Sequence, residues 1–211
     1  MKQVRNRVMG LVLVLAAGLS LAVPAQAQMS QGYKFLEAIK KKDGEQIEKM
    51  LGSSGSKTTR GDIIINSQDV TSGDTALHIV ITRKDMQWLR YLVSRKPNLD
   101  LRNYSGTTPL WLAVNTGFTE GALELIARGA KVNDPGPAGE TALIAAVHQK
   151  NLELARALIK AGADPNKADN SGRNALDYVK LSGKSSILGD EIEAASKAAK
   201  AKKKSTYGPM L

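Results

Sequence analysis

Apolar residues in the middle of the chain recur three positions apart, the spacing of one face of a helix. The first set of such pairs is Leu77 and Val80, Leu110 and Ala113, and Leu143 and Ala146. A second set lies some 15 residues after each of these: Leu92-Val93, Leu125-Ile126 and Leu158-Ile159. The pattern therefore predicts a succession of short helices that come in pairs, each with one face turned inward.

Polar and special residues between the apolar positions mark where these helices begin and end. Thr75, Thr108 and Thr141 each stand just before the first apolar set, where a hydroxyl can cap a helix. Pro109 follows at the first helical position, where a missing N–H costs nothing. Glycines such as Gly129 follow the second set, as glycine commonly does after a helix. The predicted unit is helix, turn, helix and extended turn.

This unit repeats every 33 residues. The segment Gly73–His78 recurs in register at Gly106–Trp111 and Gly139–Ile144, and more loosely at Gly172–Asp177. A second set keeps the same step: Pro97–Asp100, Ala130–Asn133 and Ala163–Asn166. Self-similarity at a fixed period indicates stacked structural repeats.

These residues resemble the ankyrin repeat family, whose signature runs Gly-x-Thr-Pro-Leu-His-x-Ala, then Leu-Leu, then Gly-Ala-Asp-x-Asn. The resemblance covers residues from about 33 to 189 and implies an all-α solenoid of helix-turn-helix units with β-turn connections. Only Pro109 keeps the proline, only His78 keeps the histidine, and Lys96-Pro97 replaces glycine-alanine. The family uses this histidine to tie neighbouring repeats together, so we expect His78 to be structural. Trp111, which replaces it, and Trp88 are expected to be packing residues.

The repeats define the predicted organisation of the chain. A secretory signal is expected at 1–27, followed by an N-terminal capping repeat at 28–69 with an inserted loop at 52–62. Three ankyrin repeats follow at 70–102, 103–135 and 136–168, then a C-terminal capping repeat at 169–193 and a Lys/Ala-rich tail at 194–211.

The first segment has the pattern of an export signal. A basic start, MKQVRNR, precedes an apolar run at 8–23 and a small-x-small cleavage pattern that ends at Ala27. We expect cleavage there and a periplasmic mature protein, with secretion from the cell as the alternative and a retained membrane anchor as the competing interpretation of the same run. No later stretch is long and apolar enough to span a membrane.

Composition narrows the chemistry. Aromatic residues make up 4% of the chain against 42% hydrophobic residues, so the core must be aliphatic. The chain contains no cysteine, which excludes disulfides, thiolate metal sites and cysteine nucleophiles. The formal net charge is +10, but much of it lies in the signal and at the C-terminal end, so nucleic acid is not an expected partner.

Motifs of catalysis are weak. Ser54 and Lys57 form a Ser-x-x-Lys sequence, but in a loop and without the partner motifs of such enzymes. Gly183–Ser185 ends like a phosphate loop yet lacks its first glycine, and Arg60–Asp62 is a three-residue match to an adhesion sequence. His148 has no further ligands at metal-binding spacing. We expect a non-catalytic monomer without cofactor or metal.

The resemblance implies that a protein partner binds the concave surface formed by the turn tips and the exposed face of each first helix. Carried over by register, the candidate contact residues are Asp74, Arg83, Tyr104, Thr107, Asn115, Glu140, His148, Gln149 and Arg173. Tyr104 is the expected anchor, because tyrosine provides a large contact area at low entropic cost.

The lysine-rich tail offers an alternative function. Lys197, Lys200 and Lys202–Lys204 could attract an anionic component of the cell envelope. The simpler interpretation is a solvated helical end that stops the solenoid from stacking further.

Overall fold

A computed structural model describes residues 30–52, 64–181 and 187–206, and of residues 202–206 only the helical backbone. The chain divides into two units, Met1–Ser30 and Gln31–Leu211, and the helices belong to the second. The predicted signal and most of the predicted inserted loop lie outside the described residues. The Ser-x-x-Lys, Arg60–Asp62 and Gly183–Ser185 motifs lie outside them as well.

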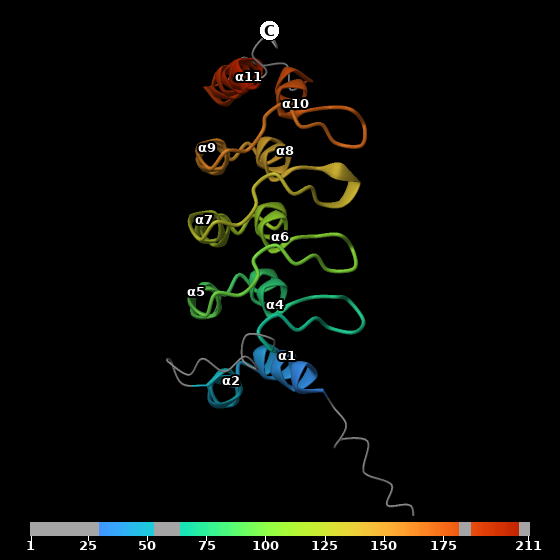
Figure 1. Ribbon diagram of the computed structural model, residues 1–211, viewed down its shortest axis with the longest axis vertical. Coiled ribbons are helices and arrows are strands. Elements are labelled where there is room, and N and C mark those ends of the chain that lie inside the picture. The colour runs from blue at the N-terminus through green and yellow to red at the C-terminus, as the bar shows by residue number, and fades with distance from the viewer. Residues whose placement is uncertain (1–29, 53–63, 182–186, 207–211) are drawn as a thin grey trace, which may run out of the picture. The chain divides into compact units, whose positions relative to one another are not determined.

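The α-helices of the described residues come in five successive pairs (Figure 1). These are α1 (Gln31–Lys41) with α2 (Gly44–Leu51), α4 (Ala76–Thr82) with α5 (Met86–Ser94), α6 (Pro109–Asn115) with α7 (Thr119–Ala127), α8 (Ala142–His148) with α9 (Leu152–Lys160), and α10 (Ala175–Leu181) with α11 (Ile187–Thr206). A 3-10 helix, η2 (Pro137–Gly139), lies in one turn. First helices stack on first helices and second helices on second, which confirms the predicted all-α repeat solenoid.

The predicted caps begin the first helices. Thr108 Oγ1 accepts the N–H of Trp111 at 3.2 Å, and Thr141 Oγ1 accepts that of Ile144 at 3.2 Å. Such a cap stabilises a helix by roughly 1 kcal/mol. Asp85 caps α5 in the same way, accepting the N–H of Trp88 at 3.2 Å.

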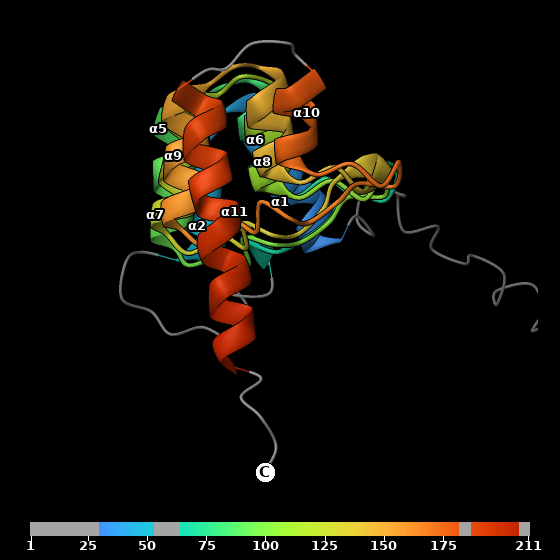
Figure 2. The same ribbon diagram turned by 90° about the horizontal axis from the view of Figure 1, so that it is seen from above.

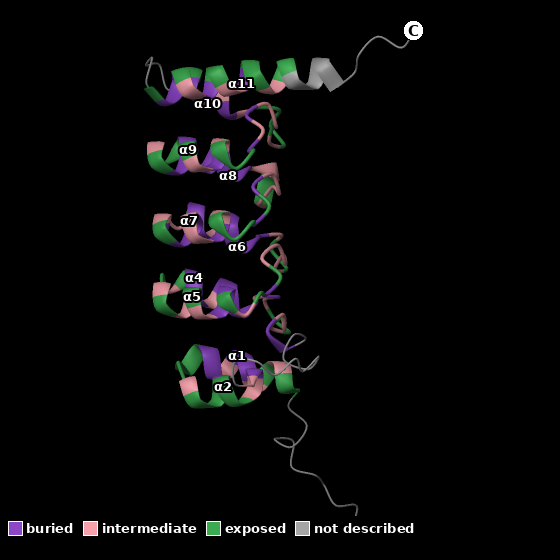
Figure 3. Ribbon diagram, turned by 60° about the vertical axis from the view of Figure 1, so that its left-hand side comes forward, coloured by how far each residue is buried: buried purple, intermediate pink, exposed green. Residues whose placement is uncertain are grey.

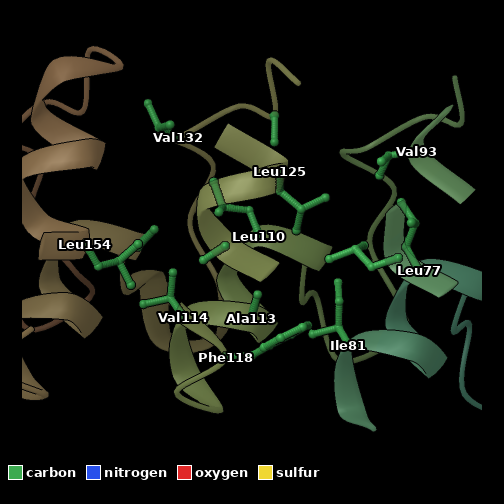
Figure 4. Packing of buried hydrophobic residues seen from close by; sticks show 14 of the residues in the cluster. Leu77, Ile81, Val93, Leu110, Ala113, Val114, Phe118, Leu125, Val132 and Leu154 are labelled. Atoms are coloured by element: carbon green, nitrogen blue, oxygen red, sulfur yellow. The ribbon is translucent and has the colours of Figure 1, made fainter. Parts of the chain in front are cut away.

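The core lies between successive helix pairs. The predicted inward residues Leu77, Leu110 and Leu143 are at most 2% exposed, and Leu92 and Leu125 are fully buried. Figure 4 shows Leu110 and Leu125 between side chains of the repeat before and the repeat after. Burial of one such side chain contributes about 1.5–3 kcal/mol, and here it depends on the neighbouring repeat being in place.

His78 joins two repeats, as predicted. Its Nδ1 accepts the backbone N–H of Thr75 at 3.2 Å, so Nε2 carries the proton and donates to the carbonyl of Thr107 at 2.9 Å. The ring is almost fully buried. Desolvation lowers the pKa of His78 from its ordinary value near 6.5, with hydrogen bonding to Thr107 and the charge of Asp74 opposing that shift.

Trp111 replaces this histidine in the next repeat and packs on a bare stretch of backbone. Its side chain is buried, which confirms its predicted packing role, and it lies against Gly136. A Cβ at Gly136 would lie 2.4 Å from the indole ring. Asn103 and Asp169 occupy the corresponding position in the turns on either side. Glycine at 136 is therefore the complement of tryptophan at 111.

The C-terminal end is closed by α11. Within the array, a carboxamide or carboxylate oxygen accepts a backbone N–H of the next repeat, as Asn133 Oδ1 does from Asp164 at 2.8 Å. At the last repeat the Asn166 oxygen accepts instead the hydroxyl of Ser196 at 2.7 Å. The side chain of Ser196 thus replaces the missing repeat. Beyond it α11 runs past the edge of the stack (Figures 2 and 3).

Gly136→Ala is expected to lower the free energy of unfolding by about 1–3 kcal/mol, because the added methyl group collides with Trp111. Gly44→Ala is the matched control: a Cβ there meets Trp88 at an ordinary 3.8 Å, so we expect a change between zero and about 1 kcal/mol of stabilisation. Urea unfolding measures both. The cost of Gly136→Ala should shrink in a Trp111→Leu background, and an equal cost in both backgrounds would contradict the packing argument.

The buried neutral His78 predicts a pH dependence of stability. The unfolded chain takes up a proton at this histidine below about pH 6.5, whereas the folded chain resists it, so stability should fall as the pH drops from about 7 to 5. The pKa values of Asp69 and Asp85 are lowered from 3.8, so they contribute only at more acidic pH.

Urea titrations at several pH values test this prediction. His78→Gln is expected to be less stable at pH 7.5 by about 1–3 kcal/mol but to lose most of the slope between pH 7 and 5. His148→Gln retains His78 and should keep that slope. The same slope in the wild-type and His78→Gln proteins would show that another group is responsible.

Candidate functional site

The turns between helix pairs project to one side of the stack and lie in a row (Figures 1 and 2). We call the outermost parts of these turns the turn tips: residues 69–73, 103–106, 136–139 and 169–172. In each, the final glycine donates its N–H to the carbonyl of the first residue, at 2.8–3.2 Å. The first tip is one residue longer than the others, since it runs from Asp69 to Gly73.

Side chains of the first tip residues hold the turns in shape. Asn103 Oδ1 accepts the N–H groups two and four residues on, at 3.1 and 3.0 Å. Asp169 Oδ1 accepts the corresponding groups at 2.8 and 3.1 Å. Hydrogen bonds to Asp169 from Tyr178 and Ser171, the first the stronger cause, hold the pKa of this carboxyl far below its usual value of 3.8. It therefore remains an anion throughout the physiological range.

Backbone hydrogen bonds join neighbouring tips. Tyr104 N–H donates to the Ser72 carbonyl at 2.9 Å, and Asn170 N–H donates to the Ala138 carbonyl at 2.9 Å. Between the second and third tips the equivalent donor position is Pro137, which has no N–H.

Arg102 spans this gap instead. Its guanidinium donates to the carbonyl of Gly106 in its own turn at 2.6 Å and to that of Pro135 in the next. Gln68 makes the same kind of bridge one repeat earlier, to the carbonyls of Gly73 and Arg102 at 2.8 Å each. Neighbouring tips are therefore linked along the whole row.

The predicted contact residues do not all lie on the accessible surface. Tyr104, Asn115, His148, Gln149 and Arg173 are exposed, whereas Asp74, Arg83 and Glu140 are half-buried. Thr107 is only 5% exposed, and its carbonyl accepts the hydrogen bond of His78. The side chain of Thr107 is therefore inside the stack.

Arg83 and Gln149 hold neighbouring repeats together. Arg83 donates to two carbonyls near the C-terminal end of α1, at 2.8 and 3.2 Å. Gln149 donates to the last two carbonyls of α6, at 2.6 and 3.2 Å. Both side chains close the end of the preceding first helix, where carbonyls lack helical partners. Their polar groups are thus engaged within the chain.

A polar and aromatic cluster lies at the third and fourth repeats, and sequence reasoning found only part of it. His148 Nδ1 lies 2.9 Å from Glu140 Oε1, and the His148 ring meets the Tyr178 ring edge-on with centroids 4.4 Å apart. Tyr178 in turn donates its hydroxyl to Asp169 Oδ2 at 2.5 Å. Tyr178 and Asp169 were missed because neither occupies a signature position. The cluster links two candidate residues into one rigid surface.

The described residues can be searched for metal-binding and membrane-spanning features. Nowhere among them do three or more His, Asp or Glu side chains come together as a metal site requires. None of the helices in that same part of the chain has both the length and the apolar character needed to cross a membrane.

Comparison with known families places the array. A family model for ankyrin repeats (3 copies) matches residues 35–136, and one for ankyrin repeats (many copies) matches residues 125–179. Together these matches run from the N-terminal helix pair to α10, which is more than half of the chain.

Similar curated proteins match over about 65 residues each. The chain is 38% identical to a B-cell lymphoma 3 protein homolog of Mus musculus over 29% of this chain and 14% of that protein. It is 37% identical to the nuclear factor NF-kappa-B p105 subunit of Gallus gallus over 31% of this chain and 7% of that protein. With the poly [ADP-ribose] polymerase tankyrase of Caenorhabditis elegans it shares 38% identity over 30% of this chain and 3% of that protein.

The chain therefore spans only a small fraction of the curated relatives it matches, and the likeness concerns their repeats. With two family models matched in register and a repeat solenoid observed, the chain belongs to the ankyrin repeat family, whose repeats are protein-interaction modules.

Proposed function

We propose that this protein is a non-catalytic interaction module of the bacterial cell envelope that binds a protein partner through its turn tips and the exposed faces of its first helices. One observation carries the proposal: hydrogen bonds between repeats hold the tips in a row, while Tyr104 on that row is 68% exposed. A surface that is ordered before binding has little entropy to lose when a partner docks.

The contacts within the chain divide the candidate residues into two groups. Tyr104, Asn115 and His148 are exposed on the surface and are the proposed contact residues, with Asp74 and Glu140 beside them. Arg173 extends the surface to the fourth repeat. Arg83, Gln149 and Thr107 support the surface from behind. Loss of a residue in the second group would act through the position of the first.

The export pattern of residues 1–27 supports a periplasmic location, with secretion as the alternative. The absence of cysteine is compatible with an oxidising compartment, where free thiols are a liability.

Binding of an anionic envelope component by the C-terminal part of α11 is the second candidate function. Here α11 continues past its last buried residue, Ser196, with Lys197 and Lys200 exposed. Lys197 pairs with Glu193 at 2.8 Å, and Ala198 and Ala201 are exposed as well. Lysines interleaved with alanines favour attraction to an anionic surface over insertion into a membrane.

Export predicts a processed protein. When the full chain is expressed in a double-membraned bacterium with a C-terminal tag, its product in the periplasmic fraction should begin at Gln28. Intact-mass measurement and N-terminal sequencing read this directly. Ala25→Leu/Ala27→Leu should block processing, because both small positions of the cleavage pattern are lost. An unprocessed chain in the cytoplasm would rule out the envelope assignment.

Affinity capture tests the binding surface. The full chain with a C-terminal tag is compared with a Tyr104→Ala/Asn115→Ala/His148→Ala variant, and captured proteins are identified by mass spectrometry. The partner's Kd, measured with purified proteins, should rise at least tenfold in this variant, a loss of about 1.4 kcal/mol or more. The matched control is Arg90→Ala/Glu120→Ala/Glu153→Ala, three exposed residues of α5, α7 and α9.

Equal losses in both variants, with unchanged thermal stability, would contradict the proposed surface. Deletion of residues 198–211 keeps Ser196 and therefore the end of the stack. Binding that disappears with this deletion and with added salt would favour the second function instead.

A further inference from the structure

The first three turn tips carry apolar side chains at one equivalent position. Val70, Tyr104 and Pro137 each directly follow the first residue of their tip. Val70 is 80% exposed and Tyr104 68% exposed, and Pro137 is exposed too. The extra residue of the first tip places Val70 34 positions before Tyr104, so a strict 33-residue comparison overlooks it.

Regular placement distinguishes this row from scattered surface residues. A single exposed apolar side chain needs no explanation, since folded proteins carry many. Here the exposed residues recur in three successive repeats, on tips linked by hydrogen bonds, and they contribute nothing to the core. An ordered apolar row at the surface is the usual mark of an interaction site.

Carboxylates flank the row at a second equivalent position. Asp74 and Glu140 each immediately precede the capping threonine of a first helix. Asp74 Oδ1 accepts from Asn103 Nδ2 at 2.8 Å, and Glu140 Oε1 lies 2.9 Å from His148 Nδ1. In each case these contacts fix one carboxylate oxygen, which orients the side chain beside the tip.

The charge of this region is opposite in sign to that of the chain. The formal net charge of the chain is +10. The charged residues of the tips and the positions next to them are the carboxylates Asp69, Asp74, Asp134, Glu140 and Asp169 and the guanidinium groups Arg102 and Arg173. Arg102 is turned into the stack, where it donates to backbone carbonyls. The first three tips therefore offer a partner apolar contact and negative charge.

Both features end at the fourth repeat. Asn170 takes the place of the apolar residues, and Arg173 takes the place of Asp74 and Glu140. A basic partner that fits the first three tips would meet like charge at the fourth. The change in both positions marks one end of the footprint.

We propose that the first three turn tips bind an extended segment of a partner protein that places apolar side chains on Val70, Tyr104 and Pro137 and basic side chains against Asp74 and Glu140. This inference rests on the protein-binding function proposed above and specifies the chemistry of the partner. Stacked helices lie about 8–10 Å apart, and an extended chain advances about 3.4 Å per residue. The two carboxylates are two repeats apart, so the basic residues should be about six positions apart.

Peptide selection tests this chemistry even though the partner is unidentified. A phage-displayed library of random 12-residue peptides is selected on the full chain and depleted on a Val70→Ser/Tyr104→Ser variant. The enriched sequences should combine apolar residues with Lys or Arg about six positions apart. Fluorescence anisotropy with a synthetic enriched peptide should show the Kd rising at least tenfold in Asp74→Asn/Glu140→Gln, and rising in 500 mM salt.

Two substitutions of equal chemistry elsewhere serve as controls. Glu153→Gln removes an exposed carboxylate from α9, and Leu181→Ser removes an exposed apolar side chain from α10; neither should change the Kd. Enriched peptides that are acidic, or whose affinity survives Asp74→Asn/Glu140→Gln, would overturn the proposal. Failure of any peptide to be enriched would overturn it too.

The captured partner separates this inference from the proposed function. A partner lost with Asn115→Ala/His148→Ala but retained by Val70→Ser and by Asp74→Asn/Glu140→Gln would leave the binding surface in place and refute the inference. A captured partner that depends on none of these residues would refute both.

Discussion

Backbone groups at the edge of each repeat find their partners in the next one, and the rest of the molecule follows from that constraint. His78 reaches across to the carbonyl of Thr107, and Asn133 Oδ1 accepts the N–H of Asp164 one repeat on. Arg83 and Gln149 close helix ends in the repeat before. Because each contact crosses an interface, a repeat is stable only when its neighbours are in place.

The same constraint explains how the array ends and where its regularity can be broken. Ser196 supplies with a hydroxyl the donor that a further repeat would supply with its backbone. Pro137 removes one link between tips, and Arg102 restores a link at that point with its guanidinium group. Trp111 abandons the histidine bridge and requires glycine at 136 instead. Departures from the repeat pattern are thus compensated locally, and the row of tips is preserved as a surface for binding.

Much of this was predictable from the sequence because the fold is built from local patterns. The helices follow from apolar spacing, their starts from the threonines, and the structural role of His78 from its place in the signature. The directions of long side chains were not predictable. Arg83 and Gln149 occupy positions that face a partner in the family, yet they bend back to carbonyls more than 30 residues away in sequence.

The cluster of Tyr178 with Asp169, and the row that includes Val70, escaped notice for related reasons. Tyr178 stands at a position without a signature, and its hydrogen bond depends on how the fourth turn folds. Val70 lies in a tip that is one residue longer than the others, so that register alone assigns it no counterpart. A fixed period identifies equivalent positions only where the turns are equally long, and burial such as that of Thr107 emerges only from stacking.

The central claim is that a protein partner docks on the turn tips and the first-helix faces. Hydrogen–deuterium exchange of the full chain, with and without the partner recovered by capture, tests it most directly. The account predicts added protection in residues 69–74, 103–106 and 136–140 and at the C-terminal ends of α6 and α8, with little change in α5, α7 and α9. Protection confined to the second helices or to α11 would contradict it.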